Sequence, residues 1–190
     1  MKTLLSVLII LSSTPAFASD VDKVLADIKV LTEQEDVAEY RTVAQSLVKY
    51  AKAHNMDYRM VLALFMTESS MNQKAVSATG DLGIGQINYD IWQEEFSRLK
   101  KAPLDKDKLK KDCDYAIKRT VEILAILKNV KDRKWIAKYH SKTPSLKNAY
   151  FKRIDKQLVK MAKADKVKKA KIIIVKNISL NKEMLVATNP

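Results

Sequence analysis

The chain has 190 residues, of which 35 are Lys or Arg and 22 are Asp or Glu, so its formal net charge is +13. Its single cysteine excludes an internal disulfide, and its two histidines lie too far apart for the usual spacing of a metal site. The length suits one domain with its own core and a short appendage. Such a basic chain is attracted to anionic wall polymers, lipid headgroups or nucleic acid, or it simply carries a solvated basic surface.

Residues 1–18, MKTLLSVLIILSSTPAFA, have the pattern of a secretory signal peptide. Lys2 precedes an apolar run from Leu4 to Leu11, and a small-residue pattern predicts cleavage after Ala18. The run is too short to span a bilayer, although a buried N-terminal helix or a membrane anchor is the alternative interpretation. We therefore expect a periplasmic or secreted protein without a transmembrane segment in the mature chain.

Seven helices are expected after the predicted cleavage site, because apolar residues recur at helical spacing. They cover residues 21–33, 36–54, 57–70, 89–99, 109–130 and 133–141, and a seventh begins at 144. Asn55 predicts a left-handed end to the second helix, and Asp57 predicts an N-cap for the third.

The C-terminal part of the chain differs in composition from the rest. From Ser145 onward there are 12 Lys or Arg against 3 Asp or Glu. Within it, KIIIVK (Lys171 to Lys176) is β-branched and predicts a short strand, for which MLVAT at 184–188 is a candidate partner. The alternative is a disordered basic tail.

All three glycines of the chain lie in one stretch, ATGDLGIGQIN, at positions 80, 83 and 85. Glycine is needed where the backbone takes positive φ or where another group must come close to it. The stretch is therefore expected to be a shaped loop. Gln86 and Asn88 at its end offer amides that suit a ligand rich in hydroxyl and acetamido groups, such as an amino sugar.

Glu68 is the candidate for acid–base chemistry. It follows Val61, Leu64 and Phe65 at i, i+3, i+4 and i+7 on one face of the third predicted helix. Burial against apolar neighbours raises the pKa of a carboxyl group, which is what a general acid needs. A glutamate at a helix end is nevertheless more often simply solvated. The glycine loop that follows Glu68 in the sequence favours the catalytic interpretation.

The stretch ESSMNQKAVSATGDLGIGQIN resembles the core motif of the lytic transglycosylases of the soluble-transglycosylase, goose-lysozyme-like group. That family has Glu-Ser, a following Asn, Ala-Val-Ser and then Gly-x-x-Gly-x-x-Gln, and the spacing matches here without a gap. A second segment, WIAKYHSKTPSLKNAYFKRI, resembles the later tyrosine motif of the family. Its YHS-x-TP is similar to that of small transglycosylases that accompany secretion and conjugation systems.

The resemblance implies a mainly α, lysozyme-like domain over residues 37–166. A helical extension would cover 19–36 and a basic extension with the possible strand 167–190. It also implies site residues, with Glu68 as the catalytic residue. The implied substrate-binding residues are Ser69, Gly83, Gln86, Ile87, Asn88 and Tyr139. Of these Asn88 is a weaker match to the family, as are Ser70 and His140. Gly85 stands where the family commonly has Met, and we expect it to loosen the loop and widen the site.

The activity implied is cleavage of the β-1,4 bond between N-acetylmuramic acid and N-acetylglucosamine without water, giving 1,6-anhydromuramic ends. One glutamate acts as acid and then as base, without metal or cofactor. The expected partners are peptidoglycan strands and, by analogy, a secretion or conjugation apparatus.

Three other functions compete with this one. A lysozyme-type hydrolase would need a second carboxylate, with Asp81 or Asp90 as candidates. A catalytically silent peptidoglycan-binding assembly protein would not need Glu68, Gln86 and Tyr139 together. A nucleic-acid or membrane-surface binder would explain the basic charge but not the glycine cluster, so we expect no specific nucleic-acid partner.

Overall fold

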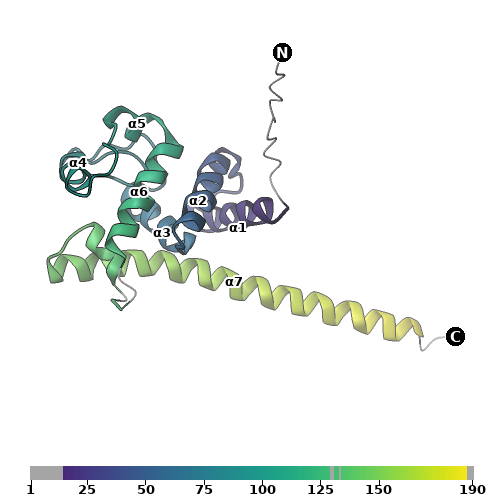
Figure 1. Ribbon diagram of the computed structural model, residues 1–190. Helices are drawn as coiled ribbons and strands as arrows, with labels where there is room; N and C mark the ends of the chain where they lie inside the picture. The colour runs from purple at the N-terminus through teal and green to yellow at the C-terminus, as the bar shows by residue number, and fades with distance from the viewer. Residues whose placement is uncertain (1–14, 129–130, 133, 188–190) are drawn as a thin grey trace, which may run out of the picture.

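The computed structural model describes residues 15–128, 131–132 and 134–187, with side chains from 16 to 169 within these ranges. This part of the chain is mainly helical and contains no strand, only two isolated bridges, Val76 with Leu82 and Leu82 with Ile87. Its elements are shown in Figure 1. They are α1 (Pro15–Thr32), η1 (Ala38–Tyr40), α2 (Arg41–Ala53), α3 (Tyr58–Ser69), α4 (Tyr89–Arg98), α5 (Lys106–Lys111), α6 (Cys113–Leu127), η2 (Trp135–Tyr139) and α7 (Pro144–Ala187). The expected lysozyme-like helical fold is confirmed.

The larger of two hydrophobic clusters joins α1, α2, α3, α6, η2 and the proximal part of α7. Leu64 and Phe65 of α3 are fully buried in it. Helix α1, which we expected as an extension ahead of the domain, contributes the fully buried Val24 and Ile28 to the same cluster. Burying one such side chain stabilises the fold by about 1.5–3 kcal/mol, so α1 is an integral part of the folded body.

An ion-pair network around the buried Asp27 carboxylate joins α1 and α7 to α3. The Arg59 guanidinium donates to both carboxylate oxygens of Asp27 on α1, at 2.7 and 3.0 Å, and to Asp165 on α7 at 2.6 Å. Tyr58 donates a further hydrogen bond to Asp27 at 2.8 Å. Because a buried carboxylate is costly unless it is paired, these contacts define how the three helices meet.

The smaller hydrophobic cluster lies under the glycine loop and joins it to α4, α5 and α6. Ile87 of the loop, Phe96 of α4 and Leu109 of α5 are fully buried in it. Leu127 and Tyr139 pack against both clusters. The two packed regions therefore meet at the end of α6 and at η2.

Local side-chain chemistry sets several helix boundaries. The Asp57 side chain accepts a hydrogen bond from the Arg59 amide at 2.9 Å, and Asn55 has φ +46°, which confirms both predicted helix boundaries. The single helix predicted over 109–130 is wrong, because the chain breaks between α5 and α6. Asp112 is extended there and its carboxylate accepts from the Tyr115 amide at 3.0 Å, since an aspartate favours capping a helix over continuing one.

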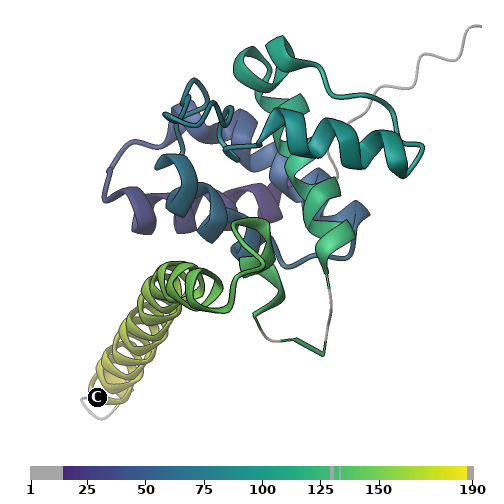
Figure 2. The ribbon, with the colours of Figure 1, turned by 90° about the vertical axis from the view of Figure 1, so that its left-hand side faces the viewer.

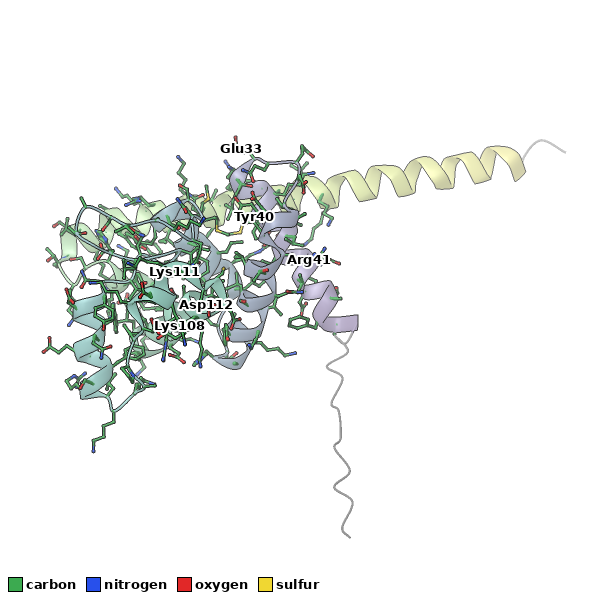
Figure 3. All side chains as sticks on the ribbon, turned by 90° about the horizontal axis from the view of Figure 1, so that it is seen from above. Glu33, Tyr40, Arg41, Lys108, Lys111 and Asp112 are labelled. Carbon is green, nitrogen blue, oxygen red and sulfur yellow. The ribbon has the colours of Figure 1, made fainter. Side chains whose placement is uncertain are left out.

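The predicted strand at Lys171–Lys176 is also wrong, because α7 continues as a helix through Ala187. A strand needs a partner for its backbone groups, whereas a helix pairs them within itself. Residues that extend an existing helix avoid the cost of nucleation, which outweighs the modest helix penalty of β-branched residues. Figures 1, 2 and 3 show the distal part of α7 leaving the body.

The N-terminal predictions fall partly outside the described residues. Helix α1 begins at Pro15 and runs across the predicted cleavage site after Ala18, while residues 1–14 lie outside the described part of the chain. No helix in the described ranges is both long and apolar enough to cross a bilayer.

Candidate active site

Glu68 lies on the last turn of α3, at the end of the stripe that buries Val61, Leu64 and Phe65 completely. The helix ends at the next residue, Ser69, and Ser70 after it takes the left-handed conformation with φ +52°. Glu68 itself is half-buried and lines a cleft of about 400 Å³. The buried face of α3 therefore ends in a carboxyl group that lines the cleft.

The cleft lies at the junction of the two hydrophobic clusters. Helix α4 contributes Ile91, Trp92 and Glu95 to its lining, and the segment from Lys138 to Lys142 contributes five further residues. The glycine loop and the end of α6 complete the lining. The site is thus assembled from five separate parts of the chain.

The Glu68 carboxyl is in contact with Tyr150 of α7. The Tyr150 hydroxyl donates to Glu68 Oε1 at 2.5 Å, and the Tyr150 ring is buried. Burial raises the pKa of Glu68, the hydrogen bond from Tyr150 and the charge of Arg153 oppose this, and the charge of Asp81 adds to the rise. The net direction is upward, so Glu68 keeps its proton to a higher pH than an exposed glutamate.

Tyr150 is a site residue that the sequence analysis did not identify. A buried tyrosine usually needs a partner for its hydroxyl, and that requirement was the one available signal. Burial first, and then the charge of Glu68, hold the pKa of Tyr150 well above its usual value. Tyr150 therefore remains a hydrogen-bond donor.

Tyr139, one of the predicted substrate-binding residues, lines the cleft, and its hydroxyl donates to the Gly85 carbonyl at 2.7 Å. It therefore holds the glycine loop, while Tyr150 holds Glu68. His140 also lines the cleft and stacks on the Tyr150 ring, with centroids 4.7 Å apart and planes inclined by 6°.

The glycine loop has the close approaches that its composition predicted. Gly83 has φ +70°, and a Cβ there would lie 2.2 Å from the Leu109 carbonyl oxygen. A Cβ on Gly85 would lie 2.2 Å from Thr120 Oγ1 of α6. The expectation that Gly85 loosens the loop is wrong, because its small size brings the loop against α6 and its carbonyl accepts from Tyr139.

Two predicted ligand-binding amides, Gln86 and Asn88, line the cleft. Gln86 Nε2 donates to the carbonyls of Ala75 and Gly83, at 3.1 and 2.9 Å. Asn88 caps α4 and donates to Asp81 Oδ1 at 2.8 Å. These bonds hold both amides in fixed positions at the cleft.

Three other residues predicted to bind substrate instead support the structure of the loop. Within the described chain, the lining of the cleft does not include Ser69, Gly83 or Ile87. The Ser69 hydroxyl donates to the Ile84 carbonyl at 2.8 Å, and Ile87 is fully buried in the smaller cluster. Ser69 therefore joins the loop to α3, and Ile87 joins it to the core.

The other carboxylates near the cleft already have partners. Asp81 lines it and accepts from Ser77, Thr79 and Asn88 at 2.8 to 3.0 Å. Glu95 lines it and pairs with Arg98 through both oxygens. Asp90 belongs to a separate surface hollow on α4. The geometry leaves Glu68 as the one carboxyl among the described residues that combines burial, a raised pKa and a place in the cleft.

No group of three or more His, Cys, Asp or Glu side chains arranged to hold a metal occurs within the described residues. Cys113 is half-buried, and burial, with Asp112 and Asp114 nearby, raises the pKa of its thiol to about 11. A thiol with that pKa is a poor nucleophile near neutral pH, as expected for a structural cysteine.

Comparison with known proteins agrees with this geometry. The family described as Transglycosylase SLT domain matches residues 45–142, a range that includes Glu68, the glycine loop and Tyr139 and ends before Tyr150. No curated protein matches the chain. Since the match covers more than half of its length, the chain belongs to the transglycosylase SLT domain family, whose members act on peptidoglycan.

Proposed function

We propose that the protein cleaves the β-1,4 bond between N-acetylmuramic acid and N-acetylglucosamine without water, leaving a 1,6-anhydromuramic end. The observation that supports the proposal is the half-buried carboxyl group of Glu68, which lines the cleft. Its pKa is raised, and it accepts a hydrogen bond from a single tyrosine, Tyr150. This reaction uses one group as acid and then as base, and one suitably placed group is what the cleft offers.

In the first step the protonated Glu68 carboxyl gives its proton to the glycosidic oxygen. The bond from muramic C1 to that oxygen breaks, and the N-acetylglucosamine chain leaves with a free 4-hydroxyl. The acetamido group of the muramic residue stabilises the positive charge that develops at C1. A raised pKa keeps Glu68 protonated for this step near neutral pH.

In the second step the Glu68 carboxylate removes the proton of the muramic 6-hydroxyl. O6 then attacks C1 and closes the anhydro ring, which returns Glu68 to its protonated form. The Tyr150 hydroxyl stabilises the carboxylate between the two steps and fixes its position. The proton that Glu68 gives in the first step is thus balanced by the one that it takes in the second.

A hydrolytic mechanism needs a second carboxylate to activate water or to act as a nucleophile. Asp81 is the candidate that lies in the cleft, but its oxygens accept hydrogen bonds from Ser77, Thr79 and Asn88. Those bonds tie the Asp81 carboxylate to the loop. They support transglycosylation over hydrolysis.

The setting of this activity is part of the proposal. The signal-peptide pattern of residues 1–18 supports export to the periplasm or beyond. The YHS-x-TP segment supports a small transglycosylase that opens the wall for a secretion or conjugation apparatus. Residues 37–166 would carry the catalytic site, with α1 packed into the same folded body, and 167–190 would form a basic extension.

Mass spectrometry of the products from purified sacculi tests the reaction. We expect anhydro-muropeptides from the chain that begins at Ser19, and none from the Glu68→Gln variant. Reducing-end products, one water heavier, would overturn the proposal in favour of a hydrolase. Circular dichroism of the variant shows whether its loss of activity leaves the fold intact.

A further inference from the structure

One wall of the cleft is basic. Lys138 at the end of η2 and Lys142 in the connection to α7 line it, with His140 at the position midway between them. Lys142 is exposed, and its charge reaches Glu95 of α4, another lining residue, whose pKa is lowered first by Arg98 and then also by Lys142. A cation at this position faces whatever fills the cleft.

The carboxylates of the cleft do not neutralise this wall by direct contact. Glu68 is bonded to Tyr150, Glu95 to Arg98, and Asp81 to groups of its own loop. Lys138 lies 3.5 Å from Asp132, which is not a lining residue. Within the described residues Lys142 has no carboxylate within 4.0 Å, so its charge is the one most available to a ligand.

The substrate of the proposed function carries matching charges. The muramic ring must lie against Glu68, because the bond that breaks is at its C1. The same ring bears the lactyl group from which the stem peptide extends, and that peptide carries free carboxylates. The peptide must therefore leave the cleft close to its walls, and one of those walls is basic.

We propose that the segment Lys138–Lys142 binds carboxylates of the stem peptide, with Lys142 as the principal contact. The protein then prefers glycan strands whose stem peptides carry free carboxylates. This inference rests on the proposed function and specifies the substrate of that same site. An ion pair between Lys142 and a carboxylate would place a peptide-bearing muramic residue at Glu68 more often than an uncharged one.

The experiment removes the charge from each partner in turn. Native sacculi are compared with sacculi whose stem carboxylates have been converted to methylamides by carbodiimide and excess methylamine. Each is digested by the unmodified protein, by Lys142→Met and by the control Lys101→Met. Lys101 is exposed, lies between α4 and α5 outside the cleft, and its loss changes the net charge equally.

We expect Lys142→Met and methylamide capping each to lower the relative kcat/KM by about three- to tenfold, as for a partly screened ion pair. On capped sacculi, unmodified protein and Lys142→Met should agree within about twofold, because the two changes remove one interaction. Lys101→Met should behave as unmodified protein on both substrates. In 1 M salt, where the Debye length is about 3 Å, the difference between native and capped sacculi should disappear.

Two outcomes would overturn the inference while leaving the proposed function in place. One is an equal loss for Lys142→Met on native and capped sacculi, and the other is a loss for Lys101→Met as large as that for Lys142→Met. An absence of anhydro products from the unmodified protein on both substrates would instead overturn the proposed function, and the inference with it.

Discussion

Two features of the candidate site, the glycine loop and the pair of tyrosines Tyr139 and Tyr150, depend on contacts at different ranges of the sequence. The glycine loop is held largely by its own residues, as in the bonds from Gln86 to Gly83 and from Asn88 to Asp81. Tyr139 and Tyr150 act through contacts 54 and 82 residues away, with Gly85 and Glu68. The loop can therefore be interpreted from the residues that it contains, whereas the tyrosines gain their roles only when the chain folds.

The largest expected effect is on the loop, in Gly83→Ala. An alanine there keeps an unfavourable φ of +70° and places its Cβ 2.2 Å from the Leu109 carbonyl oxygen, a backbone atom. We expect a loss of about 3 kcal/mol or more in the free energy of unfolding, from the left-handed backbone and the clash together. For a chain of this size that corresponds to a fall in Tm of about 6–12 °C, measured by circular dichroism.

Gly80→Ala is the matched control for Gly83→Ala. Gly80 has φ +85°, but a Cβ there would meet no atom within 4 Å. Only the conformational cost remains, which is about 1–2 kcal/mol. Equal losses from the two variants would mean that the close contact of Gly83 with α5 adds nothing to the cost of the substitution.

The next largest effect is expected from Tyr150→Phe, which removes the long-range hydrogen bond to Glu68. A hydrogen bond to a charged group contributes about 1.5–3 kcal/mol, so we expect kcat to fall about 10- to 100-fold. The Tyr150 hydroxyl lowers the pKa of Glu68, so its removal raises that pKa further. The decline in activity at high pH, where Glu68 loses its proton, should therefore move to higher pH.

Tyr139→Phe separates the two tyrosines. This change removes the donor to the Gly85 carbonyl, which should lower stability by about 1–3 kcal/mol. The alkaline limb of the pH profile should stay where it is, since Tyr139 donates to the loop and not to Glu68. A shift of that limb in Tyr139→Phe as large as in Tyr150→Phe would show that the two residues are not separate in function.

The same distinction explains how much of the structure the sequence predicted. The burial of the stripe that ends in Glu68, the cap at Asp57 and the left-handed Asn55 follow from local spacing and side-chain chemistry, and all three are confirmed. The close contacts of the glycine loop were expected as well. What they contact, Leu109 and Thr120, was not, because no local pattern tells which helix lies behind a loop.

The two wrong predictions of secondary structure relied on local propensity alone. The β-branched run in KIIIVK favours a strand only if a partner strand exists, and α7 continues through it as a helix. The residues of α5 and α6 have helical spacing throughout, yet Asp112 interrupts them by capping the next helix. In both cases a contact or a competing hydrogen bond, rather than propensity, decides the local structure.

A smaller effect should come from Glu68→Gln, as a gain in stability. Burial raises the pKa of Glu68, so the folded chain holds that proton more tightly than the unfolded chain does. Folding stability therefore falls as pH rises through the unfolded pKa toward the folded one, and it stays lower above both. We expect the glutamine variant to melt about 1–4 °C higher than the unmodified protein at pH 7.

At pH 4, close to the pKa of an exposed glutamate, this advantage should be nearly absent. Thermal melts of both proteins across that range test the direction. An unchanged or lower Tm for Glu68→Gln at pH 7 would mean that the carboxylate is better stabilised by Tyr150 and Arg153 than its burial suggests.

The smallest effect is expected at the far end of α7, from a chain that stops after Lys169. Its proximal part keeps the contacts that join it to the body, namely Tyr150 with Glu68, the fully buried Met161 and Asp165 with Arg59. We expect Tm within about 2 °C and product yield within about twofold of the full chain, because these contacts are retained.

A chain that stops after Lys160 lacks Met161 and Asp165. Its free energy of unfolding should fall by about 2–5 kcal/mol, as for other large core losses. If both truncations are equally harmful, the distal part of α7 helps to position Glu68. If only the second is harmful, the site needs α7 up to Asp165, and the helix beyond it is available for another role.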